Sequence, residues 1–292
     1  MIEFINVSKS YKKGIKAVDD LTLKINDGEI FGFLGPNGAG KSTSIRMLTG
    51  ILNIDEGQIL LDGKDIEKQP IEAKRTFGYV ADDPDQFLSL KGIEYLNFMA
   101  DVYQVENRKD IIKSLTEKFE IADALNSRIE SYSHGMRQKI VICGCLLNNP
   151  KNWILDEPMT GLDPRSSFDL KEMMRKHAAE GNCVFFSTHV LDVAEKLCDR
   201  VGIINKGKLL FTGTLQEMRE TFKEDVSLEQ LFLEITENDY EYHQSDEDLS
   251  DLGFQQRWKQ KKKECGLKIY FLWPAVCLSD RGVQLWLLCP AQ

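Results

Sequence analysis

Apolar residues recur with two different periods along the 292-residue chain. Nearly uninterrupted apolar runs, which are typical of strands buried on both faces, occupy residues 30–34, 153–155 and 184–186. Further strands are predicted at 4–7, 21–25, 59–61, 77–80, 201–204 and 209–211. Between about residues 88 and 149 the apolar period becomes helical, and helices are also predicted at 42–50, 168–179 and 190–198. Strands that alternate with helices predict an α/β fold with a mainly parallel sheet and antiparallel hairpins at its border.

Turn residues predict how these strands are connected. The polar segment 8–14 is expected to end the first strand. Asn26-Asp27-Gly28 is typical of a hairpin that joins strand 21–25 to the strand starting at Ile30. Asp62-Gly63 and Lys206-Gly207 indicate two more hairpins, after strands 59–61 and 201–204.

A glycine-rich segment follows the apolar run 30–34 directly and reads Gly35-Pro36-Asn37-Gly38-Ala39-Gly40-Lys41-Ser42-Thr43. It fits G-x-x-x-x-G-K-[ST], the Walker A phosphate loop. Its glycines let backbone N–H groups converge on a polyphosphate, Lys41 adds a positive charge, and the Ser42 hydroxyl can ligate Mg²⁺. A glycine-rich turn with an unrelated lysine is the alternative. The strand before the segment and the helix after it favour phosphate binding.

Two acids, Asp156 and Glu157, follow the apolar run 153–155. Open α/β sheets place their ligands at the carboxyl ends of such strands. One carboxylate there can hold Mg²⁺ while its neighbour activates a water molecule. A turn that merely tolerates acids is the alternative, but Pro158 closes the turn and a phosphate loop precedes it. We therefore favour the catalytic interpretation.

Segment 132–136 opens a predicted helix with Tyr132-Ser133-His134-Gly135-Met136. Ser133 is either an N-cap alone or part of a second anion site built from its hydroxyl and the helix N-terminus. Two such sites are hard to place on one triphosphate within one chain. In a head-to-tail dimer they can meet.

Bulk composition narrows the classes of partner. The net charge of −9 disfavours a nucleic-acid partner, and the seven cysteines contain no C-x-x-C pair, which indicates reduced, cytosolic thiols. Four of these cysteines lie in apolar settings and are predicted to be core residues, namely Cys143, Cys145, Cys183 and Cys198. His177 is predicted to be a solvated helix residue. The apolar runs fall short of the roughly 20 residues that a transmembrane helix needs, so we expect a soluble chain.

Together these motifs resemble, in order and spacing over residues 1–236, the nucleotide-binding subunit of an ABC transporter. In this resemblance 35–43 corresponds to Walker A, 153–157 to Walker B, 132–136 to the LSGGQ signature, 161–163 to the D-loop, His189 to the switch histidine and Tyr11 to the aromatic residue that stacks on adenine. The resemblance implies a P-loop NTPase (RecA-like) core with an antiparallel β subdomain and a small helical subdomain at about 88–149.

The resemblance also implies a mechanism. Two subunits would hold two ATP molecules head to tail, each between the Walker A loop of one subunit and Ser133, His134, Gly135 and Met136 of the other. Glu157 would be the general base, His189 would contact the γ-phosphate and Asp163 would couple the two sites. Mg²⁺ would be held by Ser42, Asp82 and Asp156. ATP and Mg²⁺ are thus the implied cofactors.

The implied partners are transmembrane permease subunits and a second copy of the chain or a homologous ATPase, at the cytoplasmic face of the cell membrane. No nucleic acid is expected. The short helical insert and segments 187–191 and 201–205 resemble drug, antibiotic or lipid efflux subunits, and this analogy favours an exporter.

The sequence departs from the family pattern in the signature and in the loop after strand 77–80. The signature has Tyr132 for Leu, His134 for Gly and Met136 for Gln. Asp82 stands where the family usually has Gln, and it supplies a charged oxygen but no amide donor. Asp82 could also belong to an ordinary turn over 82–85. If these departures disable the cycle, the chain would be a low-turnover nucleotide-binding regulator.

A soluble ABC ATPase that acts on ribosomes or DNA is the other alternative, although such proteins usually carry two cassettes or a long insert. Residues 237–292 differ from the rest, with an acid-rich stretch at 237–251 followed by lysines at 259–263. We expect a poorly ordered extension there, either regulatory or produced by translation past the natural end of the gene.

Overall fold

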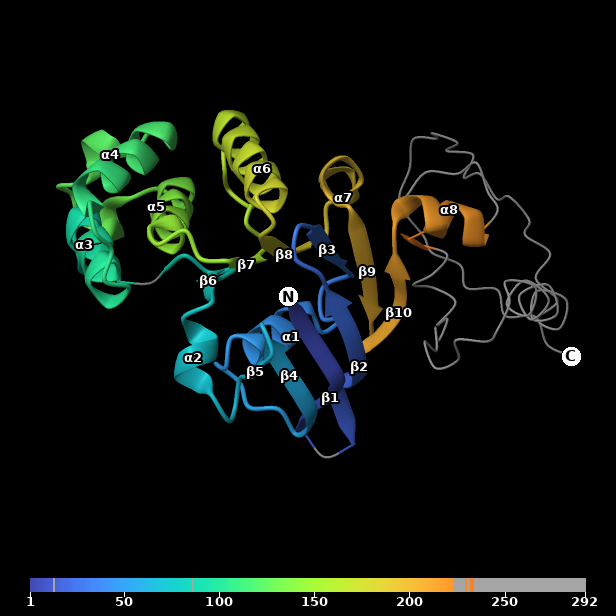
Figure 1. The fold of residues 1–292 in the computed structure, drawn as a ribbon. Helices are drawn as coiled ribbons and strands as arrows, with labels where there is room; N and C mark the ends of the chain where they lie inside the picture. Colours follow the sequence, from blue (N-terminus) through green and yellow to red (C-terminus); the bar gives the residue numbers. More distant parts are fainter. Residues whose placement is uncertain (13, 86, 223–228, 230–231, 234–292) are drawn as a thin grey trace, which may run out of the picture. The chain divides into compact units, whose positions relative to one another are not determined.

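The computed structural model describes residues 1–12, 14–85, 87–222, 229, 232 and 233. Within these residues the strands form one six-stranded and one four-stranded sheet (Figure 1). The tail predicted at 237–292 lies outside the described residues. The domain limit at residue 236 stays a prediction.

The six-stranded sheet has the order β10-β9-β3-β8-β7-β6. All its strands are parallel except β10, which runs antiparallel to β9. The strands are β3 (Ile30–Leu34), β6 (Phe77–Val80), β7 (Asn152–Asp156), β8 (Cys183–Thr188), β9 (Arg200–Asn205) and β10 (Lys208–Gly213). Every residue of β3, β7 and β8 is buried, which confirms the prediction from their apolar runs.

The four-stranded sheet is antiparallel, with the order β2-β1-β4-β5. Its strands are β1 (Ile2–Lys12), β2 (Ile15–Ile25), β4 (Glu56–Leu61) and β5 (Lys64–Asp65). The hairpins predicted at Asp62-Gly63 and Lys206-Gly207 are confirmed by the antiparallel pairs β4–β5 and β9–β10.

Two predictions about this region are wrong. The first strand does not end before residue 8 but continues to Lys12, because its polar residues pair with β2, for example Ser10 with Lys16. Asn26-Asp27-Gly28 does not close a hairpin either. Strand β2 pairs with β1, whereas β3 pairs with β8 and β9, so the turn leads from one sheet to the other. The apolar β3 is buried at every position in the parallel sheet, while the alternating β2 suits a sheet with one solvated face.

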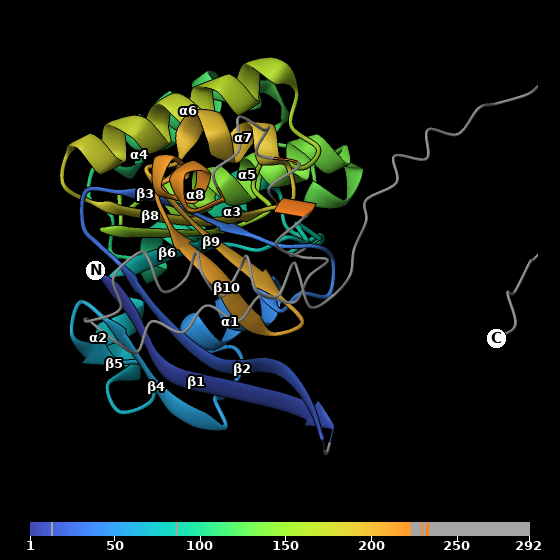
Figure 2. The same ribbon diagram turned by 90° about the vertical axis from the view of Figure 1, so that its right-hand side faces the viewer.

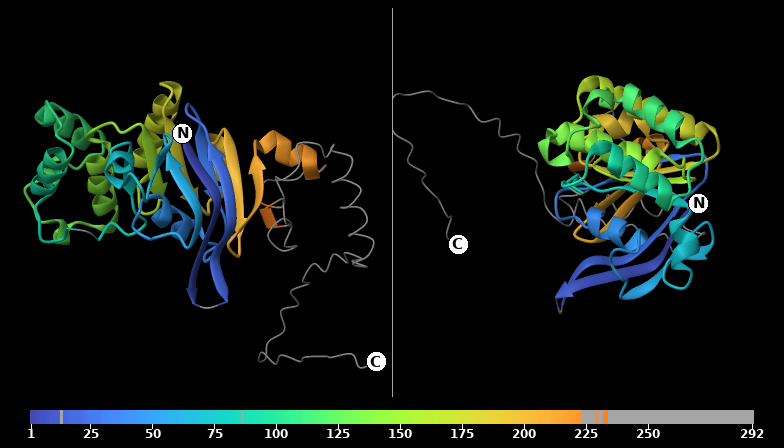
Figure 3. Two further views of the ribbon diagram at one scale, coloured as in Figure 1. Left: turned by 60° about the horizontal axis from the view of Figure 1, so that its bottom comes forward. Right: turned by 90° about the vertical axis from the view of Figure 1, so that its left-hand side faces the viewer.

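Helices cover both faces of the six-stranded sheet. They are α1 (Lys41–Leu48), α2 (Pro70–Lys74), α3 (Gly92–Val102), α4 (Arg108–Lys118), α5 (His134–Leu146), α6 (Pro164–Ala179), α7 (Leu191–Leu197) and α8 (Leu215–Phe222), with short 3₁₀ turns at Ala122–Ala124 and Ile129–Ser131. Helices α6 and α7 contact β3 and β8 on one face, and α1 lies on the other, where it contacts β2 and β7 (Figure 2). Helices α3, α4 and α5 form a group beside β6 (Figure 3). No helix in the described residues is long and apolar enough to cross a bilayer.

Four phenylalanines join the two sheets in the core. The Phe185 ring of β8 lies 5.6 Å from Phe33, 6.1 Å from Phe31 and 6.4 Å from Phe4 between centroids, all tilted. Phe4 belongs to the antiparallel sheet, so these contacts pack β1 against β3 and β8. Strand β3 leads into the phosphate loop, and β8 ends just before His189. Aromatic pairs at these distances contribute about 0.5–1.5 kcal/mol each beyond burial.

Three of the four predicted core cysteines, Cys143, Cys145 and Cys183, are fully buried, and Cys198 is partly buried. All four are free thiols. Burial raises the pKa of Cys145 and Cys183 to about 12, so these thiols are neutral packing residues rather than nucleophiles.

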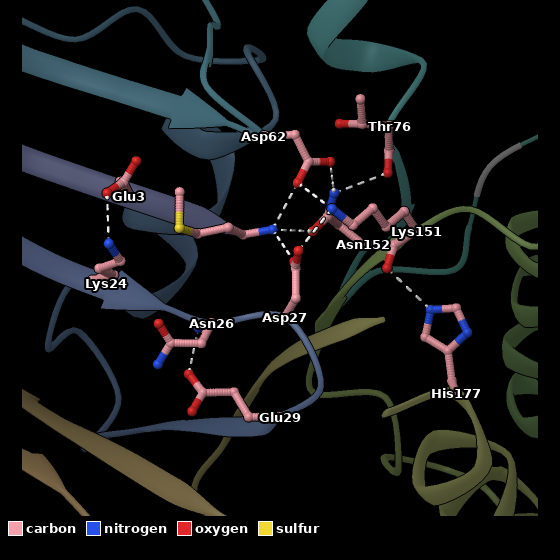
Figure 4. A network of polar contacts seen from close by, with 11 residues as sticks. Glu3, Lys24, Asn26, Asp27, Glu29, Asp62, Thr76, Lys151, Asn152 and His177 are labelled. Carbon is pink, nitrogen blue, oxygen red and sulfur yellow. Dashed lines mark hydrogen bonds and ion pairs between the residues drawn. The ribbon is translucent and has the colours of Figure 1, made fainter. Parts of the chain in front are cut away.

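At the amino end of β7, a polar network ties the sheets together (Figure 4). Lys151 Nζ lies 2.8 Å from both Asp27 Oδ2 and Asp62 Oδ1, and Asn152 Nδ2 donates to Asp62 Oδ2 at 3.0 Å. Asp27 comes from the β2–β3 connection and Asp62 from the β4–β5 turn. The network therefore links the two sheets at the amino end of β7, opposite to the carboxyl end that carries Asp156 and Glu157.

The prediction that His177 is solvated is wrong. Its side chain is only 3% exposed and stacks on Trp153, with ring centroids 4.1 Å apart and planes 19° apart. His177 Nε2 lies 3.2 Å from the Lys151 carbonyl oxygen (Figure 4). Burial lowers the pKa of His177, so its neutral form is favoured in the folded protein. Position 177 faces the sheet, because its ring packs on Trp153 of β7.

Candidate active site

The glycine-rich loop between β3 and α1 has the backbone that phosphate binding needs. Gly38 and Gly40 have φ angles of +80° and +113°. A Cβ at Gly40 would lie 2.6 Å from the Ala17 carbonyl oxygen, so position 40 requires glycine. Gly35, Ala39 and Gly40 are buried, whereas Pro36, Asn37 and Gly38 are exposed. The exposed part of the loop is thus open to a ligand.

Lys41 starts α1 and lies across the loop. Its ammonium donates to the carbonyl oxygens of Gly35 at 2.6 Å and Pro36 at 3.3 Å, and the residue is 6% exposed. Burial lowers the pKa of Lys41, and the charges of Glu157 and Asp156 oppose this shift. A buried ammonium group in these surroundings is poorly hydrated, and it is therefore suited to binding a polyanion.

Asp156, the last residue of β7, has no solvent exposure. Ser187 Oγ donates to its Oδ1 at 2.5 Å, while its Oδ2 has no hydrogen-bond partner in the described part of the chain. Burial raises the pKa of Asp156; Ser187 and the nearby Ser42 hydroxyl favour its charged form. An unpartnered carboxylate oxygen beside a hydroxyl is the oxygen donor set that Mg²⁺ prefers, so the residues present fit this ion.

The Glu157 carboxylate lies close to both Lys41 and His189. Its Oε1 lies 3.0 Å from His189 Nδ1 and 3.8 Å from Lys41 Nζ. Glu157 has a φ of +48°, and its N–H donates to Ser187 Oγ at 3.0 Å, which fixes this left-handed turn. The carboxylate is largely buried, whereas His189 is 55% exposed. A fixed carboxylate at the mouth of a phosphate site can accept a proton from water.

Ser187 bridges Asp156 and Glu157, and no role for it was predicted. Strands β7 and β8 are parallel neighbours, and their register pairs Asp156 with Ser187. The one available sequence signal was a hydroxyl residue closing an apolar run. That signal becomes meaningful only when the neighbouring strand is known.

Tyr11 and Asp82 lie near the two ends of the predicted site. The Tyr11 hydroxyl is 3.3 Å from Thr43 Oγ1 and the residue is 59% exposed, so it offers an aromatic surface beside the loop. Asp82 follows β6, and its Oδ1 lies 3.9 Å from an Arg46 guanidinium nitrogen of α1. The structure thus brings Tyr11, the loop, Asp82, Asp156, Glu157 and His189 to one region.

Segment 133–136 lies elsewhere, at the start of α5. Ser133 caps this helix by accepting from the Met136 N–H at 3.3 Å, and both Ser133 and His134 are exposed. A Cβ at Gly135 would lie 2.5 Å from the Gly161 carbonyl oxygen. The segment is therefore packed against the loop that follows Glu157.

Asp163 is used within its own chain. Its carboxylate accepts from the Ser166 N–H and hydroxyl at 2.9 and 2.8 Å, which caps α6, and it pairs with the buried Lys139 at 2.6 Å. The hydrogen bond from Lys139, followed by those from Ser166, holds the pKa of Asp163 well below its usual range. If Asp163 couples the two ATP sites, it would therefore do so by setting the position of the 161–163 loop.

A buried lysine on a glycine-rich loop, with two carboxylates and a histidine at the carboxyl edge of a parallel sheet, defines a nucleoside-triphosphatase site. Comparisons with known proteins specify the family. The family model described as "ABC transporter" matches residues 18–160. The chain is 35% identical over 228 residues to "ABC transporter ATP-binding protein NatA" of Bacillus subtilis (strain 168), covering 76% of this chain and 92% of NatA.

It is 37% identical over 220 residues to "Lipopolysaccharide export system ATP-binding protein LptB" of Escherichia coli (strain K12), covering 73% of this chain and 90% of LptB. A solved structure described as "Structure of ATP binding subunit of ABC transporter" is 31% identical with a TM-score of 0.76, covering 80% of this chain and 99% of that one. The chain belongs to the ATP-binding proteins of ABC transporters. Its fold is the ABC ATPase fold, and its activity is ATP hydrolysis coupled to transmembrane transport.

Proposed function

We propose that this chain is the ATP-hydrolysing subunit of an exporter and works as a head-to-tail dimer with a nucleotide at each of two shared sites. The observation that carries the catalytic part is the position of Glu157 Oε1, 3.0 Å from His189 and 3.8 Å from Lys41. A base, a phosphate-binding cation and a further donor meet there beside the buried Asp156. This arrangement supports hydrolysis of a phosphoanhydride rather than nucleotide binding alone.

Each residue has a role in this proposal. The backbone of 35–43 and Lys41 bind the ATP phosphates, and the Tyr11 ring lies under the base. Ser42, Asp156 and Asp82 would hold Mg²⁺, which when bound neutralises phosphate charge. Glu157 accepts the proton of the attacking water, and His189 contacts the γ-phosphate.

The positions of the two phosphate-binding segments support the proposed dimer. The Walker A loop follows β3, and α5 packs beside β6, three strands away in the order β3-β8-β7-β6. The contact with β6 lies near the end of α5, where Cys145 packs on Gly78, whereas Ser133 and Gly135 lie at the start of the helix, beside Gly161. The exposed start of α5 suits the γ-phosphate bound by a partner. A homologous ATPase could replace the second copy.

The exporter assignment rests on likeness. LptB is named as part of an export system, and this chain aligns with 90% of its length. We infer that separate permease subunits carry the translocation path, and that the ATPase is held by them at the cytoplasmic face of the membrane.

The catalytic proposal is tested with Glu157→Gln. This change removes the base but keeps the size of the side chain, so we expect ATP turnover to fall by at least about 100-fold while ATP binding persists. Glu106→Gln, at an exposed position outside the site, is the matched control and should keep wild-type turnover. Turnover retained in Glu157→Gln would contradict the role of Glu157.

The transport proposal is tested by isolating Glu157→Gln with ATP from native membranes and identifying bound proteins by mass spectrometry. A multi-spanning membrane protein is expected. Recovery of ribosomes or soluble complexes alone would replace the transporter with a soluble ATPase. The same complex prepared with the wild-type chain, placed in liposomes with its ATPase side outward, should move a fluorescent lipid analogue inward with ATP, and outward movement would indicate import.

A further inference from the structure

Helix α1 points two side chains toward the same edge of the sheet. Ser42 and Arg46 are four residues apart, so they lie on one face of the helix about one turn apart. Ser42 lies next to Asp156 at the end of β7. Arg46 reaches Asp82 after β6, at 3.9 Å. One helix face thus connects the two carboxylates that are proposed to hold the metal.

The two carboxylates are held at the same edge by the sheet. Strands β6 and β7 are parallel neighbours whose register pairs Val80 with Leu155. Asp156 follows directly after Leu155, and Asp82 follows two residues after Val80. Both acids therefore leave the sheet at its carboxyl edge.

These groups act on one another electrostatically. The charge of Asp82 contributes to raising the pKa of Asp156, after burial as the main cause. The same charges act on Tyr79. Burial is the main cause that raises the pKa of Tyr79, the charges of Asp156 and Asp82 raise it further, and the charge of Arg46 lowers it. Asp82 is thus within electrostatic reach of the buried carboxylate, and Arg46 offsets its charge.

We propose that Arg46 and the divalent cation compete for the carboxylate of Asp82, so that Arg46 weakens metal binding and favours metal release. This inference rests on the proposed role of Asp82 as a metal ligand. A cation and a metal ion cannot both neutralise one carboxylate fully. Arg46 therefore sets how much of the charge of Asp82 is available to the metal.

The size of the effect follows from exposure. The side chains of Arg46 and Asp82 are 47% and 40% exposed, so solvent screens their attraction. Exposed ion pairs of this kind change an equilibrium by about two- to fivefold. The competition is therefore a modest adjustment of affinity, and it should weaken further in 1 M salt.

The experiment measures Mn²⁺ binding to the full chain saturated with a non-hydrolysable ATP analogue, with free Mn²⁺ followed by electron paramagnetic resonance. Arg46→Gln should tighten Mn²⁺ binding by about two- to fivefold. Arg46→Lys keeps the charge and is the matched control, expected within about 1.5-fold of wild type. Asp82→Gln should weaken binding.

The decisive variant is Arg46→Gln combined with Asp82→Gln. If Arg46 acts through Asp82, adding Arg46→Gln to Asp82→Gln changes Mn²⁺ affinity by less than about 1.5-fold. An equal tightening in both backgrounds would mean that Arg46 acts on the phosphates directly, and would overturn the proposal. Unchanged affinity in Asp82→Gln would overturn it too. Neither result would affect the turnover and membrane tests above, so the proposed function and this inference fail separately.

Discussion

Ser187 holds the two catalytic-site acids in place, and its removal should cost more stability than a buried serine usually does. Ser187→Ala removes the donor to Asp156 Oδ1 at 2.5 Å and the acceptor of the Glu157 N–H at 3.0 Å. Asp156 has no solvent exposure, and its Oδ2 already lacks a partner in the described residues. The variant would remove the Ser187 donor from a buried carboxylate and leave only the nearby Ser42 hydroxyl as a neutral donor.

The magnitude follows from the two lost contacts. A hydrogen bond to a charged group contributes about 1.5–3 kcal/mol, and a buried N–H left without a partner costs about 1–3 kcal/mol. Because Glu157 N is only partly buried, we take the lower part of the second range and expect a loss of about 3 kcal/mol in the free energy of unfolding. For a domain of this size that loss lowers the melting temperature by about 6–12 °C.

The assay is thermal unfolding of the full chain at pH 7.5, followed by far-UV circular dichroism. Ser114→Ala, an exposed position on α4, is the matched control and should melt within about 2 °C of wild type. Ser187→Cys keeps the volume with a weaker donor, so it should melt between wild type and Ser187→Ala. A Ser187→Ala variant that melts as high as the control would refute the reasoning and would mean that water replaces the hydroxyl.

Three further predictions concern stability. Phe185→Ala should lower the free energy of unfolding by about 3–5 kcal/mol, measured by urea denaturation, and Phe185→Leu by clearly less; equal losses would show that the ring contacts are unimportant. The pKa of His177 is lowered in the folded protein, so the unfolded chain binds a proton at this residue more readily. The wild type should therefore lose stability as the pH falls below about 6.5, the ordinary pKa of histidine. His177→Gln should lose less stability than wild type between about pH 7.5 and 5.5. Gly135→Ala would stabilise an isolated helix by up to about 1 kcal/mol. In this structure, however, the added Cβ would lie 2.5 Å from the Gly161 carbonyl oxygen, so we expect a lower melting temperature. A higher melting temperature would show that the 161–163 loop moves aside at little cost.

The sequence by itself determined the elements that depend on short-range patterns. The runs that become β3, β7 and β8 are apolar on both faces, which only a buried strand allows, and the phosphate loop is specified by residue types at fixed spacing. The acids at the end of β7 followed from the same logic. The assignment to ABC transporter ATP-binding proteins was therefore predictable, and the comparisons confirmed it.

Only the tertiary structure decided which segments are neighbours. The turn at Asn26-Asp27-Gly28 has hairpin residues, but pairing depends on partner strands, and β3 finds both of its own elsewhere in the sequence. The burial of His177 on Trp153, the bridge made by Ser187 and the pairing of Arg46 with Asp82 each join residues from separate elements. Local periodicity carries no information about such contacts, because they are fixed by strand order and helix packing.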